Sequence, residues 1–181
     1  MLATILLLGI SQEIPITIRP SIIIDSTMTI EYERKPLQVK RGDRLYLSPG
    51  MQVTLSESKN PPYKIEFPDN QSISFDPGSK FVYLGDGTND KEMILILSGG
   101  LFYDHPEPAV PFRYKRRVKS KTRALGTLGT KFKLDVEDRG STIRNHVYKV
   151  YGSIEITYLQ NESDITYLDN GMEFDKIDPA P

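Results

Sequence analysis

The stretch Ser120-Lys-Thr-Arg-Ala-Leu-Gly-Thr-Leu-Gly-Thr-Lys-Phe-Lys-Leu-Asp-Val136 contains two glycines, Gly126 and Gly129, between two segments with the composition of β-strands. In the second segment, Thr130, Phe132, Leu134 and Val136 alternate with charged residues. Successive side chains of a strand point to opposite faces, so this alternation predicts a half-buried strand over 130–136. We therefore expect a strand, a tight glycine bend and a second strand.

The two glycines allow a second interpretation, a loop that binds phosphate. Such loops lead into the N-terminus of a helix, whereas the residues after Gly129 alternate with a period of two. Glycine within strand-like sequence is instead typical of a bulge, a corner or the close passage of another backbone, because it has no side chain and tolerates positive φ. The pattern favours the bend.

Composition limits the chemistry that this chain can perform. Its 181 residues, 38% of them hydrophobic, are enough for one domain with a real core. No cysteine is present, which excludes disulfides, thiolate zinc sites and cysteine nucleophiles. With two histidines, His105 and His146, and no calcium-loop motif, a metal centre would have to consist mostly of carboxylates. We expect no cofactor and no metal.

Three weaker candidates remain for a ligand or a reaction. His105 lies beside acidic residues and could titrate or bind a cation, although the prolines around it favour an extended loop. Asp86, Asp90 and Glu92 could hold a cation in a loop, but a solvated turn is the simpler interpretation. Carboxylate chemistry also stays open as a third possibility, but no serine lies in a Gly-x-Ser-x-Gly elbow.

The order of predicted segments is that of an all-β protein. Residues 1–11 are apolar and match the hydrophobic region of a secretory signal, without its basic part; a buried first strand is the alternative. Residues 12–27 contain prolines, which predict an arm or an edge strand. Residues 28–177 are expected to form many short strands separated by turn residues. Residues 178–181 are expected to be a flexible tail. We expect a sandwich, a roll or a short β-solenoid with corners at glycine.

Six segments of the chain, taken in order, resemble the FecR-like domain family. They are residues 37–45, 65–81, 94–102, 124–134, 150–156 and 168–172, and the resemblance as a whole extends over about residues 28–174. Its most specific part is the Gly-Thr-x-Phe core of Gly129, Thr130 and Phe132, which Gly126 precedes.

This resemblance implies an extracytoplasmic β-rich domain without catalytic residues. Signalling members of the family lie in the periplasm behind one membrane helix and a cytoplasmic segment that controls a sigma factor, and they receive a signal from an outer-membrane transporter. We find neither that segment nor a spanning helix in this sequence. The expectation is therefore a stand-alone member, periplasmic or otherwise exported, that acts by protein contact in envelope signal transduction.

Seven cations and no acid lie between residues 113 and 123. Six of them are at odd positions, so on one strand they would project from one face: Arg113, Lys115, Arg117, Lys119, Lys121 and Arg123. The rest of the chain has 16 basic and 24 acidic residues. This basic row predicts contact with an acidic partner, either an envelope protein or an anionic envelope polymer, and not with nucleic acid, since the row has few aromatic residues.

Two alternatives to this binding surface stay open. The basic row could be a solvated edge strand that charge protects against aggregation, or it could pair internally with acidic residues of the C-terminal part: Glu162, Asp164, Asp169, Glu173, Asp175 and Asp178. For the whole chain, the alternative function is a structural, glycan-binding or anionic-polymer-binding module of the cell envelope.

Overall fold

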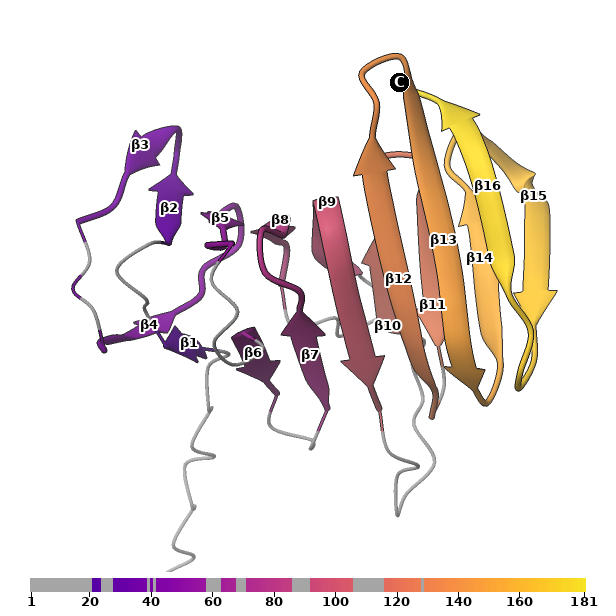
Figure 1. Cartoon of the computed structure of the whole chain (residues 1–181), viewed down its shortest axis with the longest axis horizontal. Helices are drawn as coiled ribbons and strands as arrows, with labels where there is room; N and C mark the ends of the chain where they lie inside the picture. Colours follow the sequence, from indigo (N-terminus) through magenta and orange to yellow (C-terminus); the bar gives the residue numbers. More distant parts are fainter. Residues whose placement is uncertain are drawn as a thin grey trace, which may run out of the picture.

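The computed structural model describes residues 21–23, 28–38, 40, 42–57, 63–67, 71–85, 92–105, 116–127 and 129–181. These residues contain no helix and form sixteen strands, of which fourteen make up two layers and two form a separate pair (Figure 1). The prediction of an all-β fold is confirmed, and the arrangement is like a sandwich. None of the described residues belongs to a helix that could cross a bilayer.

The strands of the first layer are β2 (Thr29–Tyr32), β3 (Lys35–Pro36), β5 (Gln52–Thr54), β8 (Lys80–Tyr83), β9 (Glu92–Asp104), β10 (Arg116–Lys119), β11 (Arg123–Thr127), β14 (Ile154–Tyr158) and β15 (Asn161–Leu168). Their spatial order is β15-β14-β11-β10-β9-β8-β5-β2-β3. Strands β9 and β10 run parallel, and the other pairs in this layer are antiparallel.

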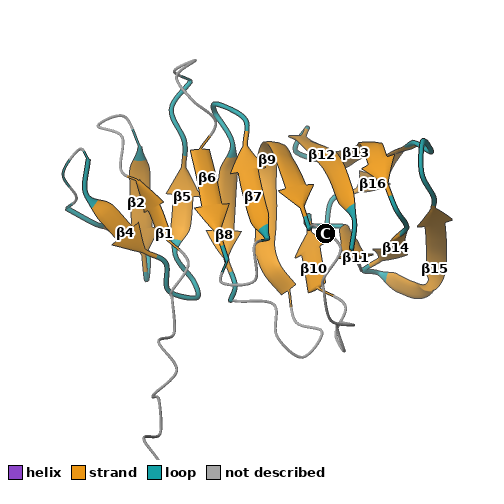
Figure 2. Ribbon diagram, turned by 90° about the horizontal axis from the view of Figure 1, so that it is seen from below, coloured by secondary structure: helices purple, strands orange, loops and turns teal. Residues whose placement is uncertain are grey.

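The second layer consists of β6 (Tyr63–Glu66), β7 (Ser72–Phe75), β12 (Lys131–Asp138), β13 (Thr142–Tyr151), β16 (Phe174–Pro179) and part of β9. Its order is β6-β7-β9-β12-β13-β16, with antiparallel pairs throughout. A separate pair, β1 (Ser21–Ile23) and β4 (Arg44–Tyr46), lies at the N-terminal end of the molecule (Figures 1 and 2).

Strand β9 belongs to both layers because it bends at two glycines. Its first half pairs with β8 and β10, and its second half, from Gly99 onward, pairs with β7 and β12. Gly99 has a φ of 90°, a conformation that side chains disfavour. The buried hydroxyl of Ser79 holds the bend, since it accepts a hydrogen bond from Gly100 N at 3.1 Å and donates one to Gly100 O at 2.9 Å.

The core lies between the two layers and confirms the alternation predicted for 130–136. Thr130, Phe132, Leu134 and Val136 are buried, and the residues between them are partly exposed. Phe132 packs against Tyr103 of β9 with ring centroids 5.3 Å apart. Burial of apolar side chains at about 25 cal/mol per Å² is the main stabilising contribution to such a layered fold.

The structure can be compared with the segments predicted at the two ends of the chain. Residues 1–20, including the predicted signal segment, lie outside the described residues, and Ser21–Ile23 of the predicted arm form β1. The prediction of a flexible tail over 178–181 is wrong, because β16 continues through Pro179 and Ala180 N donates to Ser141 O at 2.9 Å. Asp178 is buried there, with an exposed fraction of 5%.

Candidate functional site

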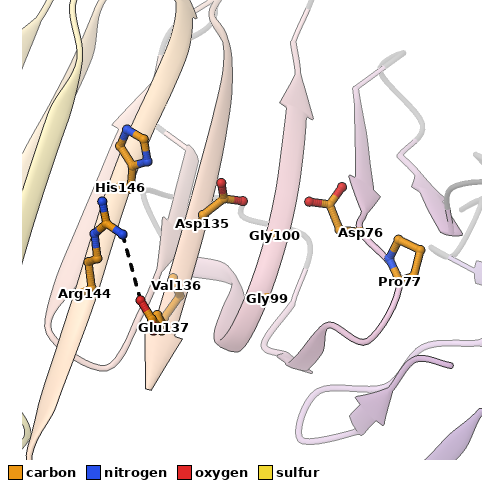
Figure 3. Close-up of a pocket in the computed structure, with 9 residues that line it drawn as sticks. All are labelled: Asp76, Pro77, Gly99, Gly100, Asp135, Val136, Glu137, Arg144 and His146. Carbon is orange, nitrogen blue, oxygen red and sulfur yellow. Dashed lines mark ion pairs between the residues drawn. The ribbon is translucent and has the colours of Figure 1, made fainter. Parts of the chain in front are cut away.

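A hollow of about 330 Å³ lies on the outer face of the second layer, above the glycines of β9 (Figure 3). In the register of the sheet, Asp135 of β12 is opposite Gly100, and Asp76 follows β7 on the other side. A Cβ atom at Gly100 would lie 2.2 Å from Asp76 Oδ2 and 2.5 Å from Asp135 Oδ1. The missing side chain therefore creates the space in which these two carboxylates face each other.

Lys133 places one positive charge between the two carboxylates. Its ammonium group forms ion pairs with Asp76 and, at 3.6 Å, with Asp135. Burial alone would lower the pKa of Lys133, but its hydrogen bond to Asp76 and the charge of Asp135 outweigh burial, so the pKa lies above its ordinary value. Burial and a hydrogen bond to Asp135 raise the pKa of Tyr148. Both groups therefore stay protonated near neutral pH, which makes neither one a general base.

The other charges around the hollow are paired as well. Arg144 donates two hydrogen bonds to Asp175, at 2.8 and 2.6 Å, and lies 3.9 Å from Glu137. The hydrogen bond to Asp175 raises the pKa of Arg144 and lowers the pKa of Asp175. His146 Nε2 and Glu173 Oε1 are hydrogen-bonded. Within the described residues, no group of three or more carboxylates and histidines could hold a metal ion.

The hollow is thus lined by charged groups that stabilise one another. Exposed pairs of this kind contribute little individually to stability, but together they fix the side chains of three neighbouring strands. Lys133 and Tyr148, whose pKa values are raised, are held within this set of paired groups. We interpret the hollow as a structural feature of the sheet.

Replacing Lys133 by methionine tests this interpretation. The variant leaves Asp76 and Asp135 facing each other without a cation, so we expect it to lose about 1 kcal/mol of unfolding free energy. Urea denaturation measures the loss, with Lys64→Met as control, since the Lys64–Glu66 pair is exposed. Equal losses in both variants would contradict a structural role of Lys133.

The predicted basic row is not one face of one strand. Arg113 and Lys115 lie outside the described residues. Arg117 and Lys119 do project outward from β10 on either side of the buried Val118, and Lys119 lies 3.8 Å from Glu92.

The row ends in a turn at Ser120, whose Oγ accepts hydrogen bonds from Thr122 N and Arg123 N. The prediction is wrong for Lys121, which lies in this turn, and for Arg123, which begins β11. A serine side chain that bonds to the following backbone favours such a turn over a continuing strand.

Arg123 points into the protein, with an exposed fraction of 2%. It donates to Asp178 through Nε at 2.9 Å and through Nη2 at 2.7 Å, and its Nη1 lies 3.4 Å from Asp164. Its guanidinium lies over the ring of Tyr158, 4.4 Å from the centroid. The alternative interpretation, internal pairing with the acidic C-terminal part, is therefore confirmed for this residue.

The residues of the predicted family motif lie in β11, in β12 and in the bend between these strands, and this bend packs against the backbone near Gly152. Gly126 lies within β11, and Gly129 forms the bend before β12 with a φ of 62°. Thr130 is buried and donates to Ser153 O at 2.9 Å. A Cβ atom at Gly152 would lie 3.1 Å from Gly129 O, so two backbones do pass closely here. Because β12 follows the bend, the phosphate-binding interpretation lacks its helix.

The remaining predicted candidates are scattered. His105 directly follows β9 and is buried, with its Nδ1 3.4 Å from Gly129 N; the prolines after it, on which the predicted extended loop depends, lie outside the described residues. Asp86 and Asp90 lie outside the described residues, and Glu92 belongs to β9. His146 lies within β13 and stacks on Tyr148.

A surface that sequence reasoning did not single out lies around β14 and β15. Eight large apolar side chains are exposed among the described residues, and five of them lie between residues 150 and 175: Tyr151, Leu159, Ile165, Tyr167 and Met172. The same stretch has six acidic residues and no lysine, arginine or histidine. The charge bias is visible in the sequence, but the apolar exposure is not, since β-rich sequence of this kind also predicts core strands.

Comparisons with known proteins concern the fold alone. No protein-family model matches the chain, and no curated protein matches it significantly. Two crystal structures of a proposed anti-sigma factor from Parabacteroides distasonis ATCC 8503, at 1.65 and 2.50 Å resolution, are similar in fold, with TM-scores of 0.49 and 0.47 and sequence identities of 13% and 12%. Each similarity covers 71% of this chain and 60% of the other chain.

Proposed function

We propose that this chain is an exported, FecR-like, non-enzymatic domain that acts in envelope signal transduction by contact with a protein partner. One observation carries the proposal: the exposed apolar side chains are concentrated around β14 and β15. Exposed apolar groups that lie close together are typical of protein interaction sites, whereas scattered ones are not. The order of the FecR-like segments and the all-β fold also support it.

The alternative, a module that binds an anionic polymer, depends on a continuous line of cations. The turn at Ser120 and the burial of Arg123 interrupt that line. A polymer would therefore meet Arg117 and Lys119 without the neighbours that the sequence pattern had predicted. This geometry favours a protein partner.

Site-specific photocrosslinking in intact cells tests the proposed function. We expect a benzoylphenylalanine at position 172, where Met172 is 51% exposed, to crosslink to one envelope protein. The same group at position 46 is the control, because Tyr46 is 55% exposed at the other end of the molecule. Crosslinks of equal yield at both positions, or none at position 172, would contradict the proposal.

Export is tested separately by fractionation and N-terminal sequencing of the mature protein. We expect recovery outside the cytoplasm and a first residue near Gln12, because small residues at positions 9 and 11 suit signal cleavage. A cytoplasmic protein that retains Met1 would contradict export.

A further inference from the structure

Strand β15 lies at the edge of the first layer and pairs on one side with β14 (Figure 1). The pairing is regular from Ile165 to Leu168, opposite Thr157 to Ile154. The next residue of β14, Tyr158, pairs with Asn161. Residues 162–164 therefore have no partner on β14 and form a bulge. No strand in the described part of the chain pairs with the other side of β15.

The two halves of β15 differ in charge and in regularity along this open edge. The first half carries Glu162, Asp164 and the bulge, all features by which proteins prevent edge strands from pairing with another chain. The second half, Ile165-Thr-Tyr-Leu168, has no charge and consists of residues that favour strands. Ile165 and Tyr167 project from one face and are 43% and 66% exposed. This half has the properties of a pairing edge.

The edge strand of the second layer provides a contrast. Strand β16 also pairs on one side among the described strands, but it carries Asp175, Lys176 and Pro179 along its length. Charge and proline protect an edge from added strands. Ile177, 54% exposed, is therefore isolated among charges, whereas Ile165 and Tyr167 form an uncharged pair.

The charge around the second half of β15 indicates what kind of segment can pair there. Asp164 and Asp169 flank it, and Glu162 lies two residues before Asp164. Asp164 pairs with Arg123 at 3.4 Å. Glu162 and Asp169 form no ion pair with a cation of the described residues, although Asp169 accepts a hydrogen bond from Ser153 Oγ at 2.6 Å. No basic residue occurs from 150 to 175. Opposite charges across an interface favour association, and like charges oppose it. An incoming basic segment is favoured and an acidic one is not.

We propose that a partner protein adds an extended basic segment to Ile165–Leu168 as an extra strand of the first layer. Backbone hydrogen bonds would hold it, apolar side chains would cover Ile165 and Tyr167, and lysine or arginine side chains would face Glu162 and Asp169. This inference rests on the proposed function, since it names the surface and the partner chemistry of that protein contact.

Fluorescence anisotropy with two short capped peptides tests the inference. One peptide alternates lysine with valine, and the other alternates glutamate with valine. We expect the lysine peptide to bind at least about tenfold more tightly, a difference of about 1.4 kcal/mol, and to bind more weakly at high salt. The double variant Ile165→Asn, Tyr167→Asn should weaken its binding about tenfold or more, and Glu162→Gln with Asp169→Asn should do the same in part.

The matched control is Ile177→Asn with Tyr46→Asn, an equally exposed isoleucine and tyrosine away from β15, which should leave binding unchanged. Equal affinity for both peptides, no binding at about 1 mM, or equal effects of the two double variants would each overturn the inference. Self-association that Ile165→Asn, Tyr167→Asn abolishes would overturn it in favour of a second copy of this chain.

The crosslink from position 172 separates failure of this inference from failure of the proposed function. If the crosslink forms and persists in the Ile165→Asn, Tyr167→Asn variant, the protein contact stands and the strand addition is wrong. If no crosslink forms in the unmodified background, the proposed function itself fails.

Discussion

Replacing Arg123 by methionine is expected to reduce the free energy of unfolding by about 3–5 kcal/mol, the range for removing one partner of a buried ion pair. The guanidinium is 2% exposed and binds both oxygens of Asp178, which is 5% exposed. Thr122 Oγ1 and Asn145 Nδ2 donate to the same carboxylate at 3.1 and 3.2 Å. Without Arg123, these neutral donors would be left to compensate a buried negative charge. Urea denaturation measures the loss.

The matched control is Arg144→Met. Arg144 forms an equally bidentate pair with Asp175, but the two side chains are 36% and 44% exposed. Water therefore screens this pair, and the expected loss is much smaller than for Arg123→Met. Similar losses in the two variants would show that burial does not determine the contribution of Arg123.

The effect of Arg123→Met should also depend on pH. Burial alone would raise the pKa of Asp178, but the hydrogen bond and positive charge of Arg123 outweigh it, so the pKa lies below its ordinary value. The pair therefore stabilises the fold above the ordinary aspartate pKa of about 3.9, and this stabilisation is lost as the pH falls through the lowered value. The difference between wild type and variant should shrink from pH 5 to pH 2. A constant difference would contradict this assignment.

A double-mutant cycle with Asp178→Asn isolates the charge. Asparagine can still accept hydrogen bonds from Thr122 and Asn145, but it carries no charge. Asp178→Asn in the Arg123→Met background should therefore recover part of the lost stability, since it removes the uncompensated carboxylate. Additive losses would mean that the two side chains act independently.

Arg123 also marks the limit of what local sequence could predict. The alternation over 130–136 gave the correct strand and the correct buried face for Phe132 and Leu134, because period and burial are local properties. The same alternation, read through residues 113–123, placed Arg123 on the surface. A turn after Lys119 reverses the chain and changes which face the next residues occupy, and the partner Asp178 lies 55 residues away. Register and distant partners are tertiary properties.

The glycines also show which properties are local and which depend on tertiary structure. The sequence predicted bends at glycine, and Gly129, Gly152 and Gly99 do have positive φ. Gly99 and Gly100, however, do not end a strand, since they lie inside the single strand β9. What makes β9 one strand is its pairing with both layers, which no local pattern reveals. The hollow above Gly100 depends on this pairing and was not predicted.

Replacing Gly99 by alanine adds a single methyl group but is expected to destabilise the fold strongly. An added Cβ would lie 2.7 Å from Ser79 Cα and 2.5 Å from Ser79 Oγ, so the backbone of the neighbouring segment must shift. Overpacking costs about 1–3 kcal/mol, and a residue other than glycine at this φ costs about 1–3 kcal/mol more. The expected loss is about 2–6 kcal/mol in thermal or urea unfolding.

Gly140→Ala separates the two contributions, since Gly140 has a similar φ of 81° and no atom within 4 Å of an added Cβ. It should cost only the conformational part, about 1–3 kcal/mol. The difference between the two variants then measures how tightly Ser79 is held against the bend that joins the layers. If Gly99→Ala loses no more unfolding free energy than Gly140→Ala, the backbone at the bend can move away from Ser79. The close packing at Gly99 then does not hold β9 in both layers.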